Sequence, residues 1–206
     1  MSSPCLYVVS APSGGGKTSL VNALLQRDDR VTLSVSHTTR APRPGEMEGV
    51  HYFFVDEQTF EDLAARGAFL EHARVFGHRY GTGRAAVEAR LASGLDVLLD
   101  IDWQGARQIR ASFPAARTIF ILPPSLAVLR QRLIDRGQDS EAVIARRMQA
   151  ARAEISHARE FDFLIVNDDF DMALADLHAI IRRGSPLRSD QERKSREILA
   201  DLLETG

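Results

Sequence analysis

The segment that most constrains the fold is a glycine-rich turn near the start of the chain, Ala11-Pro12-Ser13-Gly14-Gly15-Gly16-Lys17-Thr18. It directly follows the apolar run 5–9 and precedes a helical pattern. A strand, a glycine turn and a helix in this order predict a phosphate-binding loop, because free backbone N–H groups and a helix N-terminus attract a polyphosphate. In such a loop Lys17 reaches the β- and γ-phosphates and the Thr18 hydroxyl binds Mg²⁺. The pattern usually opens with glycine, where this chain has Ala11. The alternative is an ordinary glycine turn with a solvated Lys17.

Apolar runs alternate with helical patterns along most of the chain. Strands are expected at 5–10, 31–36, 50–55, 95–101, 117–122 and 162–167, and helices at 17–27, 57–66, 84–93, 104–112, 125–136, 140–159 and 171–183. Continuous runs such as Val97-Leu98-Leu99 indicate parallel strands that are buried on both faces. This pattern predicts an α/β fold with a doubly wound parallel sheet.

The composition of the chain argues against some classes of binding partner. A chain of 206 residues with 44% hydrophobic residues fits one soluble domain with insertions. The formal net charge of −2 argues against a nucleic-acid partner. The N-terminal apolar run is too short for a signal peptide or a membrane span, and the one cysteine cannot form an internal disulfide, so we expect a cytoplasmic protein with no membrane partner. Self-association is left open.

A second candidate site lies in the proline-bearing stretch 34–46. Pro42 and Pro44 favour an extended backbone before them, so the stretch is predicted to be a stiff loop. Arg40 and Arg43 could then grip a second phosphate through their planar guanidinium groups. Taken alone, two loop arginines are more often solvated.

Further motifs follow in order: Thr38-Thr39-Arg40, Arg43-Pro44-Gly45-Glu46, Glu71, Tyr80-Gly81-Thr82, Leu99-Asp100-Ile101-Asp102 and Ile165-Val166-Asn167-Asp168-Asp169. Together with the loop at 11–18 they closely resemble the guanylate kinase family, from about residue 5 to residue 183. The resemblance implies a P-loop type core (1–35, 94–124 and 160–183), a GMP-binding insertion (36–93) and a helical lid (125–159). Residues 184–206 are left as a charged tail, expected to be a linker with a polar helix or frayed chain.

The resemblance also implies transfer of the γ-phosphoryl group of ATP to GMP, giving ADP and GDP, with Mg²⁺. The implied GMP-binding residues are Ser36, Arg40, Arg43, Tyr52, Glu71, Tyr80, Gly81, Thr82 and Asp100. Arg40, Arg43 and the two tyrosines would hold the GMP phosphate, whereas Glu71, with Ser36 and Thr82, would read the guanine edge. For Glu71 the alternative is a surface carboxylate between a helix and a strand.

ATP is expected at Ala11, Pro12, Ser13, Gly14, Gly15, Gly16, Lys17 and Thr18, with Asn167 approaching the adenine. Arginines of the lid would stabilise the transferred group, and the resemblance favours Arg132, Arg136 and Arg147, joined in catalysis by Lys17 and Arg43. Arg130, Arg146, Arg152 and Arg159 are expected on solvated helix faces, in ion pairs such as Glu141 with Arg146.

Two acidic residues follow the apolar run Val97-Leu98-Leu99 of the strand expected at 95–101. Asp100 could support Mg²⁺ through water or contact the guanine amine, and the sequence does not separate these roles. Asp102 could instead cap the helix that follows.

Two other functions compete with GMP phosphorylation. One is a kinase for a different phosphorylated acceptor, such as a ribose bisphosphate, against which Glu71, Ser36 and Thr82 indicate a purine. The other is an inert protein-interaction module, against which Lys17, Thr18 and the lid arginines argue.

Overall fold

The computed structural model describes residues 3–75, 77–135, 137, 140–183 and 189–204. The chain forms two compact units. The first holds the chain up to Tyr7 and residues Arg30–Ala116, and the second holds Val8–Asp29 and the chain from Arg117 onward. Strand β1 (Leu6–Ser10) is therefore shared, and it is the middle strand of a five-stranded sheet of order β2-β7-β1-β8-β9.

In the first unit, β2 (Val31–Leu33) runs parallel to β7 (Asp96–Asp100), with Val31 opposite Asp96. The start of β1 lies beside β7, because the Val97 N–H donates to the Cys5 carbonyl at 3.0 Å. Helix α3 (Arg84–Ala92) packs on β7. Val97, Leu98 and Leu99 are each 1% exposed or less, which confirms the expected buried strand.

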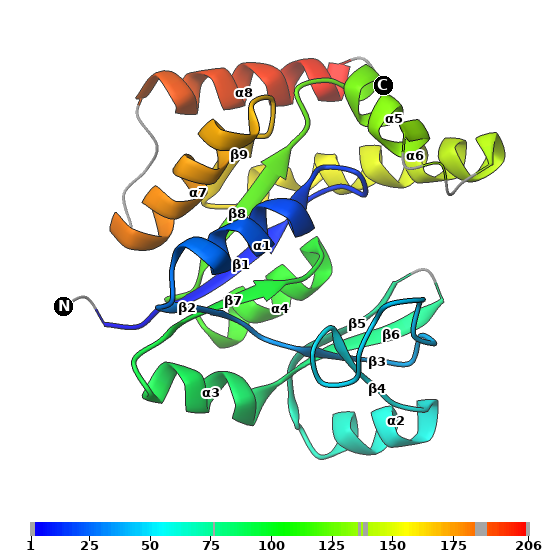
Figure 1. Ribbon diagram of the computed structural model, residues 1–206, viewed down its shortest axis with the longest axis vertical. Helices are drawn as coiled ribbons and strands as arrows, with labels where there is room; N and C mark the ends of the chain where they lie inside the picture. The colour runs from blue at the N-terminus through cyan, green and yellow to red at the C-terminus, as the bar shows by residue number, and fades with distance from the viewer. Residues whose placement is uncertain (1–2, 76, 136, 138–139, 184–188, 205–206) are drawn as a thin grey trace. The chain divides into compact units, whose positions relative to one another are not determined.

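The same unit contains a second sheet of order β4-β3-β6-β5 (Figure 1). Its strands are β3 (Ser36–Thr38), β4 (Tyr52–Phe54), β5 (Phe69–Val75) and β6 (His78–Gly83). Strands β3 and β4 are parallel, and β6 is antiparallel to both β3 and β5. Helices α2 (Glu57–Ala65) and α4 (Trp103–Ser112) both pack on β5.

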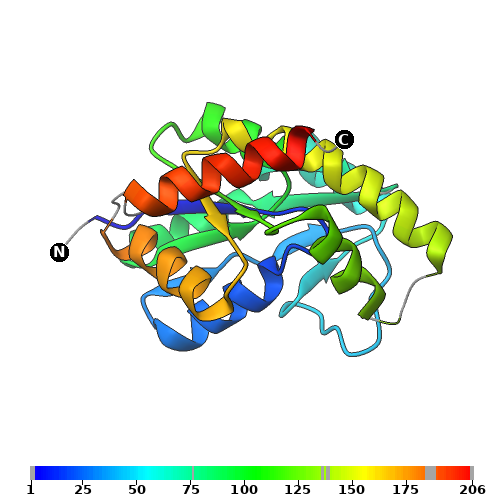
Figure 2. The ribbon, with the colours of Figure 1, turned by 90° about the horizontal axis from the view of Figure 1, so that it is seen from above.

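In the second unit, β8 (Arg117–Leu122) runs parallel to β9 (Phe163–Val166), and the end of β1 leads into α1 (Lys17–Arg27). Helix α1 packs on α7 (Phe170–Arg183). Helices α5 (Leu126–Asp135) and α6 (Glu141–Ser156) lie side by side (Figure 2), and a short 3-10 turn, η1 (Ala158–Glu160), follows α6. The α/β architecture with parallel strand pairs confirms the expected fold class.

Three details of the sequence prediction are wrong. The strand expected at 31–36 is two strands, since β2 and β3 belong to different sheets. Strand β5 occupies a segment where no strand was expected, and so does β6, which contains the Tyr80-Gly81-Thr82 motif. The alternation in β5 is hard to read because Phe69, Leu70 and Glu71 are all buried in succession, at a point where the register with β6 shifts.

The charged tail contains a folded helix, α8 (Ser189–Glu204), and is not simply frayed. Leu199 and Leu202 are 3% and 4% exposed, because α8 packs on β9 and α6. The helix thereby covers the outer edge of β9, whose Leu164 carbonyl accepts a bond from the Ser195 hydroxyl at 3.1 Å.

Candidate functional site

The glycine-rich loop after β1 has the geometry of an anion-binding turn. The Gly15 N–H donates to the Pro12 carbonyl at 2.8 Å, and Gly16, with φ of 92°, is the residue before the helix. Helix α1 then begins at Lys17, as expected. The first N–H groups of a helix have no intrahelical acceptor, so the start of a helix after such a turn can bind a phosphate.

Asn167 fixes the loop from the end of β9. Its Nδ2 donates to the Gly15 carbonyl at 2.8 Å, and the residue is only 5% exposed. A Cβ on Gly16 would lie 2.2 Å from this Nδ2, and the positive φ of Gly16 also disfavours any side chain. Glycine is therefore required at residue 16 both for the turn and for the approach of Asn167. The expected contact of Asn167 with adenine stays a prediction.

Glu154 is a second residue that contacts the loop, and it was not among the predicted site residues. Its Oε2 accepts a bond from the Ser13 N–H at 3.2 Å. Glu154 lies near the end of α6, a helix that the sequence assigned to the lid. Its position at 154, far from residue 13, carries no local signal that would connect it with the loop.

Arg132 of α5 lines a cavity of about 400 Å³ next to the loop. The other residues that line this cavity are Gly14, Gly16, Ser19, Asp135, Asn167, Asp168 and Phe170. One guanidinium nitrogen of Arg132 donates to the Asn167 carbonyl at 2.9 Å, whereas the other, Nη1, is buried without an acceptor among the described residues. A buried cationic donor that lacks an acceptor is costly, so this nitrogen favours the binding of an anion.

The other arginines of the α5–α6 region differ in their surroundings. Arg147 is partly buried, and Arg146 and Arg152 are exposed. Glu141 pairs with Arg130 and not, as expected, with Arg146, because α5 and α6 pack together. Arg136, one of the expected catalytic residues, lies outside the described residues.

The second sheet places four of the expected guanine and phosphate contacts in one row. Along the order β4-β3-β6-β5, Tyr52 pairs with Ser36, Ser36 pairs with Thr82, and Thr82 pairs with Glu71. Paired residues on neighbouring strands project to the same face of a sheet, and so does Tyr80, two residues from Thr82. These four residues, one from each strand, therefore lie on the same face of the sheet.

Glu71 is the acidic residue of this row, and it is buried, with 3% exposure. Its Oε1 accepts a 2.6 Å hydrogen bond from the hydroxyl of Thr82, which is fully buried. Burial raises the pKa of Glu71 to about 7, and the negative charge of Asp102 adds to the rise, whereas the Thr82 bond opposes it. Glu71 is not the surface carboxylate that the alternative interpretation assumed.

Arg40 is held over the same sheet. Its Nη2 donates to both oxygens of Glu46 at 2.8 and 2.9 Å, and its guanidinium carbon lies 5.4 Å from the Tyr52 ring centre. Burial, with a contribution from the charge of Asp100, raises the pKa of Tyr52 to about 12, so its hydroxyl keeps its proton and can donate. The role of Glu46 was not predicted, although it ends the motif that begins at Arg43.

Arg43 differs from Arg40 because it is exposed on the loop that follows β3. Its backbone N–H donates to Glu46 Oε2 at 2.7 Å, which ties the arginine's backbone to the partner of Arg40. The loop is thus ordered by Glu46 as well as by its prolines.

Asp100 and Asp102, at the end of β7 and just beyond it, differ in their surroundings. Asp100 ends β7 and is partly buried. Asp102 caps α4, since its Oδ1 accepts from the Gly105 N–H at 2.9 Å, which confirms the capping alternative.

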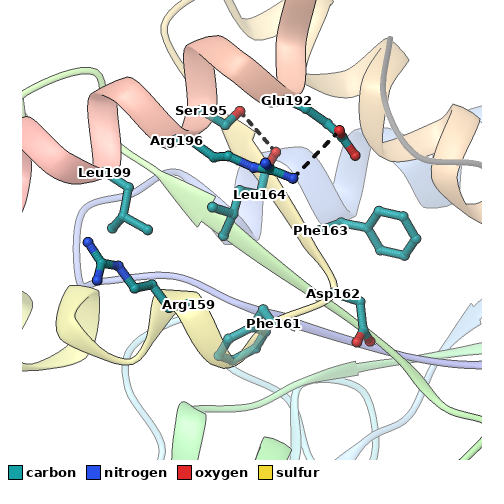
Figure 3. Close-up of a pocket in the computed structure, with 9 residues that line it drawn as sticks. All are labelled: Arg159, Phe161, Asp162, Phe163, Leu164, Glu192, Ser195, Arg196 and Leu199. Carbon is teal, nitrogen blue, oxygen red and sulfur yellow. Dashed lines mark hydrogen bonds and ion pairs between the residues drawn. The ribbon is translucent and has the colours of Figure 1, made fainter. Parts of the chain in front are cut away.

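A larger cavity, of about 440 Å³, lies between α8 and β9 and contains none of the expected site residues (Figure 3). Ser195 of α8 donates to the Leu164 carbonyl of β9, which seats the helix, whereas the exposed Arg196 and Glu192 form a 3.8 Å ion pair within α8. We assign this cavity to the packing of the C-terminal helix.

Among the described residues, no cluster of three histidine, cysteine or acidic side chains could hold a metal ion. In the part of the chain that the structure describes, no helix is long and apolar enough to span a bilayer.

A parallel α/β sheet whose β1 strand leads through a glycine loop into α1 defines a nucleotide-binding protein of the phosphate-loop class. Comparisons with known proteins narrow this class. Residues 3–184 match the family model described as guanylate kinase. The chain therefore belongs to the guanylate kinase family.

Individual relatives agree with this assignment. The chain is 60% identical over 198 residues to a guanylate kinase of Alkalilimnicola ehrlichii, covering 96% of this chain and 98% of the relative. It is 57% identical over 205 residues to a guanylate kinase of Escherichia coli K12, covering 98% and 99% respectively. A crystal structure of guanylate kinase from Anaplasma phagocytophilum matches with a TM-score of 0.75 at 35% identity, covering 98% of this chain and 96% of that one.

Proposed function

We propose that the protein is an enzyme that transfers the γ-phosphoryl group of ATP to GMP, producing ADP and GDP. Family membership and relatives of 57–60% identity over almost the whole chain support this activity. Within the structure, the observation that carries the choice of acceptor is the buried carboxylate of Glu71 in the row Tyr52–Ser36–Thr82–Glu71.

Glu71 reads the guanine base. A carboxylate offers two acceptor oxygens, which match the N1–H and the 2-amine of guanine. Adenine has an acceptor at N1 and no 2-amine, so it would offer the buried carboxylate neither of these two donors. A site of this kind can reject the wrong base by about 10⁴-fold. Ser36, Gly81, Thr82 and Asp100 are proposed to complete this part of the site.

The phosphate of GMP binds to Arg40 and Arg43, with the hydroxyls of Tyr52 and Tyr80. Arg40 is prepared for this role because Glu46 already holds its guanidinium over the Tyr52 ring. Arg43 is exposed and joins the phosphate from the loop. A fixed arginine loses little side-chain entropy when it binds an anion.

ATP binds to the loop from Ala11 to Thr18 in the second unit. Lys17 contacts the transferred phosphate, and the buried Nη1 of Arg132, which finds no acceptor in the described part of the chain, supports the binding of phosphate next to Gly14 and Gly16. Arg136 and Arg147 join from the lid. Phosphoryl transfer needs little covalent participation by the protein, so these residues act by aligning the two substrates and neutralising charge on the moving group.

Mg²⁺ is part of this proposal, and the oxygens present fit it. The exposed Thr18 hydroxyl at the start of α1 is a hard oxygen ligand, and Mg²⁺ commonly takes its other ligands from substrate phosphates and water. This mode of binding does not need a cluster of acidic side chains. When bound, the ion neutralises phosphate charge, and Asp100 is proposed to support it through water.

The proposal extends to the organisation of the chain. A core (1–35, 94–124 and 160–183), a GMP-binding insertion (36–93) and a lid (125–159) are proposed on the family pattern, and the insertion agrees with the extent of the second sheet. A cytoplasmic location is supported by the single cysteine, which can form no disulfide within the chain.

A coupled assay of ADP release tests the function. Purified protein with ATP and Mg²⁺ is offered GMP, AMP, UMP and ribose phosphates in turn. We expect turnover with GMP that exceeds turnover with AMP by orders of magnitude. Preference for a ribose phosphate would favour the other kinase, and folded protein without turnover on any acceptor would favour an interaction module.

A further inference from the structure

Helix α4 carries a glycine, Gly105, in its first turn, and neither the fold nor the backbone explains it. Glycine inside a helix costs about 1 kcal/mol relative to alanine. The φ angle of Gly105 is not positive, so alanine could adopt the same backbone conformation. Glycine is therefore present for its lack of a side chain.

The missing side chain leaves room for Glu71. A Cβ on Gly105 would lie 2.6 Å from Glu71 Oε2, 3.2 Å from its Cδ and 3.1 Å from Ile101 Cδ1. Real Cβ atoms essentially never lie as close as 2.6 Å to another heavy atom, so either the carboxylate or the helix must move.

The helix is anchored where it stands. Gln108, one turn after Gly105, accepts from the His72 N–H at 3.1 Å and donates to the His72 carbonyl at 2.8 Å. Asp102 caps the helix through the Gly105 N–H itself. Gly105, Ala106 and Ile109 form its buried face.

The Glu71 carboxylate is itself held in place by Thr82 of β6. Thr82 donates to Oε1 at 2.6 Å, and Glu71 and Thr82 are 3% and 0% exposed. The end of a long side chain normally yields cheaply to a methyl group. Here it can yield only by breaking or distorting the bond that sets its position.

We propose that Gly105 is a specificity-determining positioning residue, which holds open the space that Glu71 needs to present its carboxylate to guanine. This inference rests on the proposed function. It adds that the selection of guanine depends on the absence of a Cβ atom at residue 105 of α4.

The test compares Gly105→Ala with the wild-type protein. We expect the Kd and KM for GMP to rise roughly tenfold to hundredfold, the range for impairing a hydrogen bond to a charged group. The KM for ATP should change less than threefold, and the preference for GMP over AMP should fall. The melting temperature should not fall by more than a few degrees, since alanine favours the helix.

Gly83→Ala is the matched control. Gly83 lies next to Thr82, its φ is not positive, and an added Cβ would meet its nearest neighbour, His37, at 3.5 Å, an ordinary contact. This variant should bind GMP as the wild type does. An equal loss in the control would overturn the specific role of Gly105.

A rescue variant separates displacement of the carboxylate from general damage. Aspartate at residue 71 withdraws the carboxylate by one methylene, so Glu71→Asp should weaken GMP binding in the wild-type background. In the Gly105→Ala background the same change should cause little further loss or restore binding, because the methyl group then has room. If the fold-losses in GMP binding caused by Glu71→Asp and by Gly105→Ala simply multiply in the double variant, the proposal is overturned. It is also overturned if Gly105→Ala binds GMP as tightly as the wild type. If the wild type itself does not bind GMP, the proposed function fails instead.

Discussion

Glu71 and Thr82 lie opposite each other on β5 and β6 and share a buried hydrogen bond of 2.6 Å. The pair combines a carboxylate in a poorly solvated position with a hydroxyl that donates to one of its oxygens. A carboxylate so placed is unfavourable unless its remaining acceptor capacity is used, and a ligand with two adjacent N–H donors would use it.

Replacement of Glu71 by glutamine should weaken GMP binding selectively. Glutamine is isosteric, but it carries an NH₂ group in place of one acceptor and loses the charge. We expect the KM for GMP to rise about tenfold or more and the KM for ATP to stay nearly constant. Steady-state kinetics checks this, with the exposed Glu88→Gln as control. An equal rise in both constants would remove Glu71 from base recognition.

The pKa of Glu71 should also make stability depend on pH. Its pKa is about 7 in the folded protein against an ordinary value of 4.5, so the folded state binds the proton more tightly. The resulting stabilisation is complete below pH 4.5 and is lost as the pH rises towards and through 7. Thermal unfolding between pH 5 and 8 should show this loss, and Glu71→Gln should have a flatter profile. Parallel profiles for the two proteins would contradict the raised pKa.

Lys17→Ala should reduce turnover by roughly hundredfold or more, because a charge that contacts the transferred phosphate acts mainly in the transition state. GMP binding should persist, since the acceptor residues belong to the first unit. Heat-stability shifts with GMP provide that second readout. Turnover close to wild type would refute the assignment of the phosphate loop.

Arg132→Ala should raise the KM for ATP and lower kcat by about tenfold or more, because it removes a buried donor next to the loop that has no acceptor among the described residues. Arg130→Ala is the matched control on the same helix, since Arg130 is exposed and pairs with Glu141. If the two substitutions had similar effects on the KM for ATP and on kcat, the loss would come from the reduced positive charge of α5 and not from the buried nitrogen of Arg132.

The candidate site was predictable to different degrees in its two parts. The phosphate loop and the start of α1 at Lys17 could be predicted because strand, turn and helix are contiguous and each has a local signature. Asp102 as a cap was likewise a local pattern. The contacts of Glu154 with the glycine-rich loop and of Glu46 with Arg40 were not predicted, since a carboxylate that holds a loop or an arginine looks like any other surface acid in the sequence.

The second sheet was the least predictable element. Strand β5 has a register shift and three consecutive buried residues, and β6 contains two glycines within six residues, so neither shows clean alternation. A strand of this kind is stabilised by its neighbours more than by its own propensity, which only the folded chain displays.

The sequence by itself determined the class of nucleotide loop, the α/β alternation and the residue types available for a purine acceptor, because these depend on local order and composition. Only the tertiary structure decided that Tyr52, Ser36, Thr82 and Glu71 form one row, and that Gly105 leaves space for the carboxylate at its end. The reason is physical: strand register and the docking of α4 on β5 are set by long-range packing, and neither leaves a periodic trace in the chain.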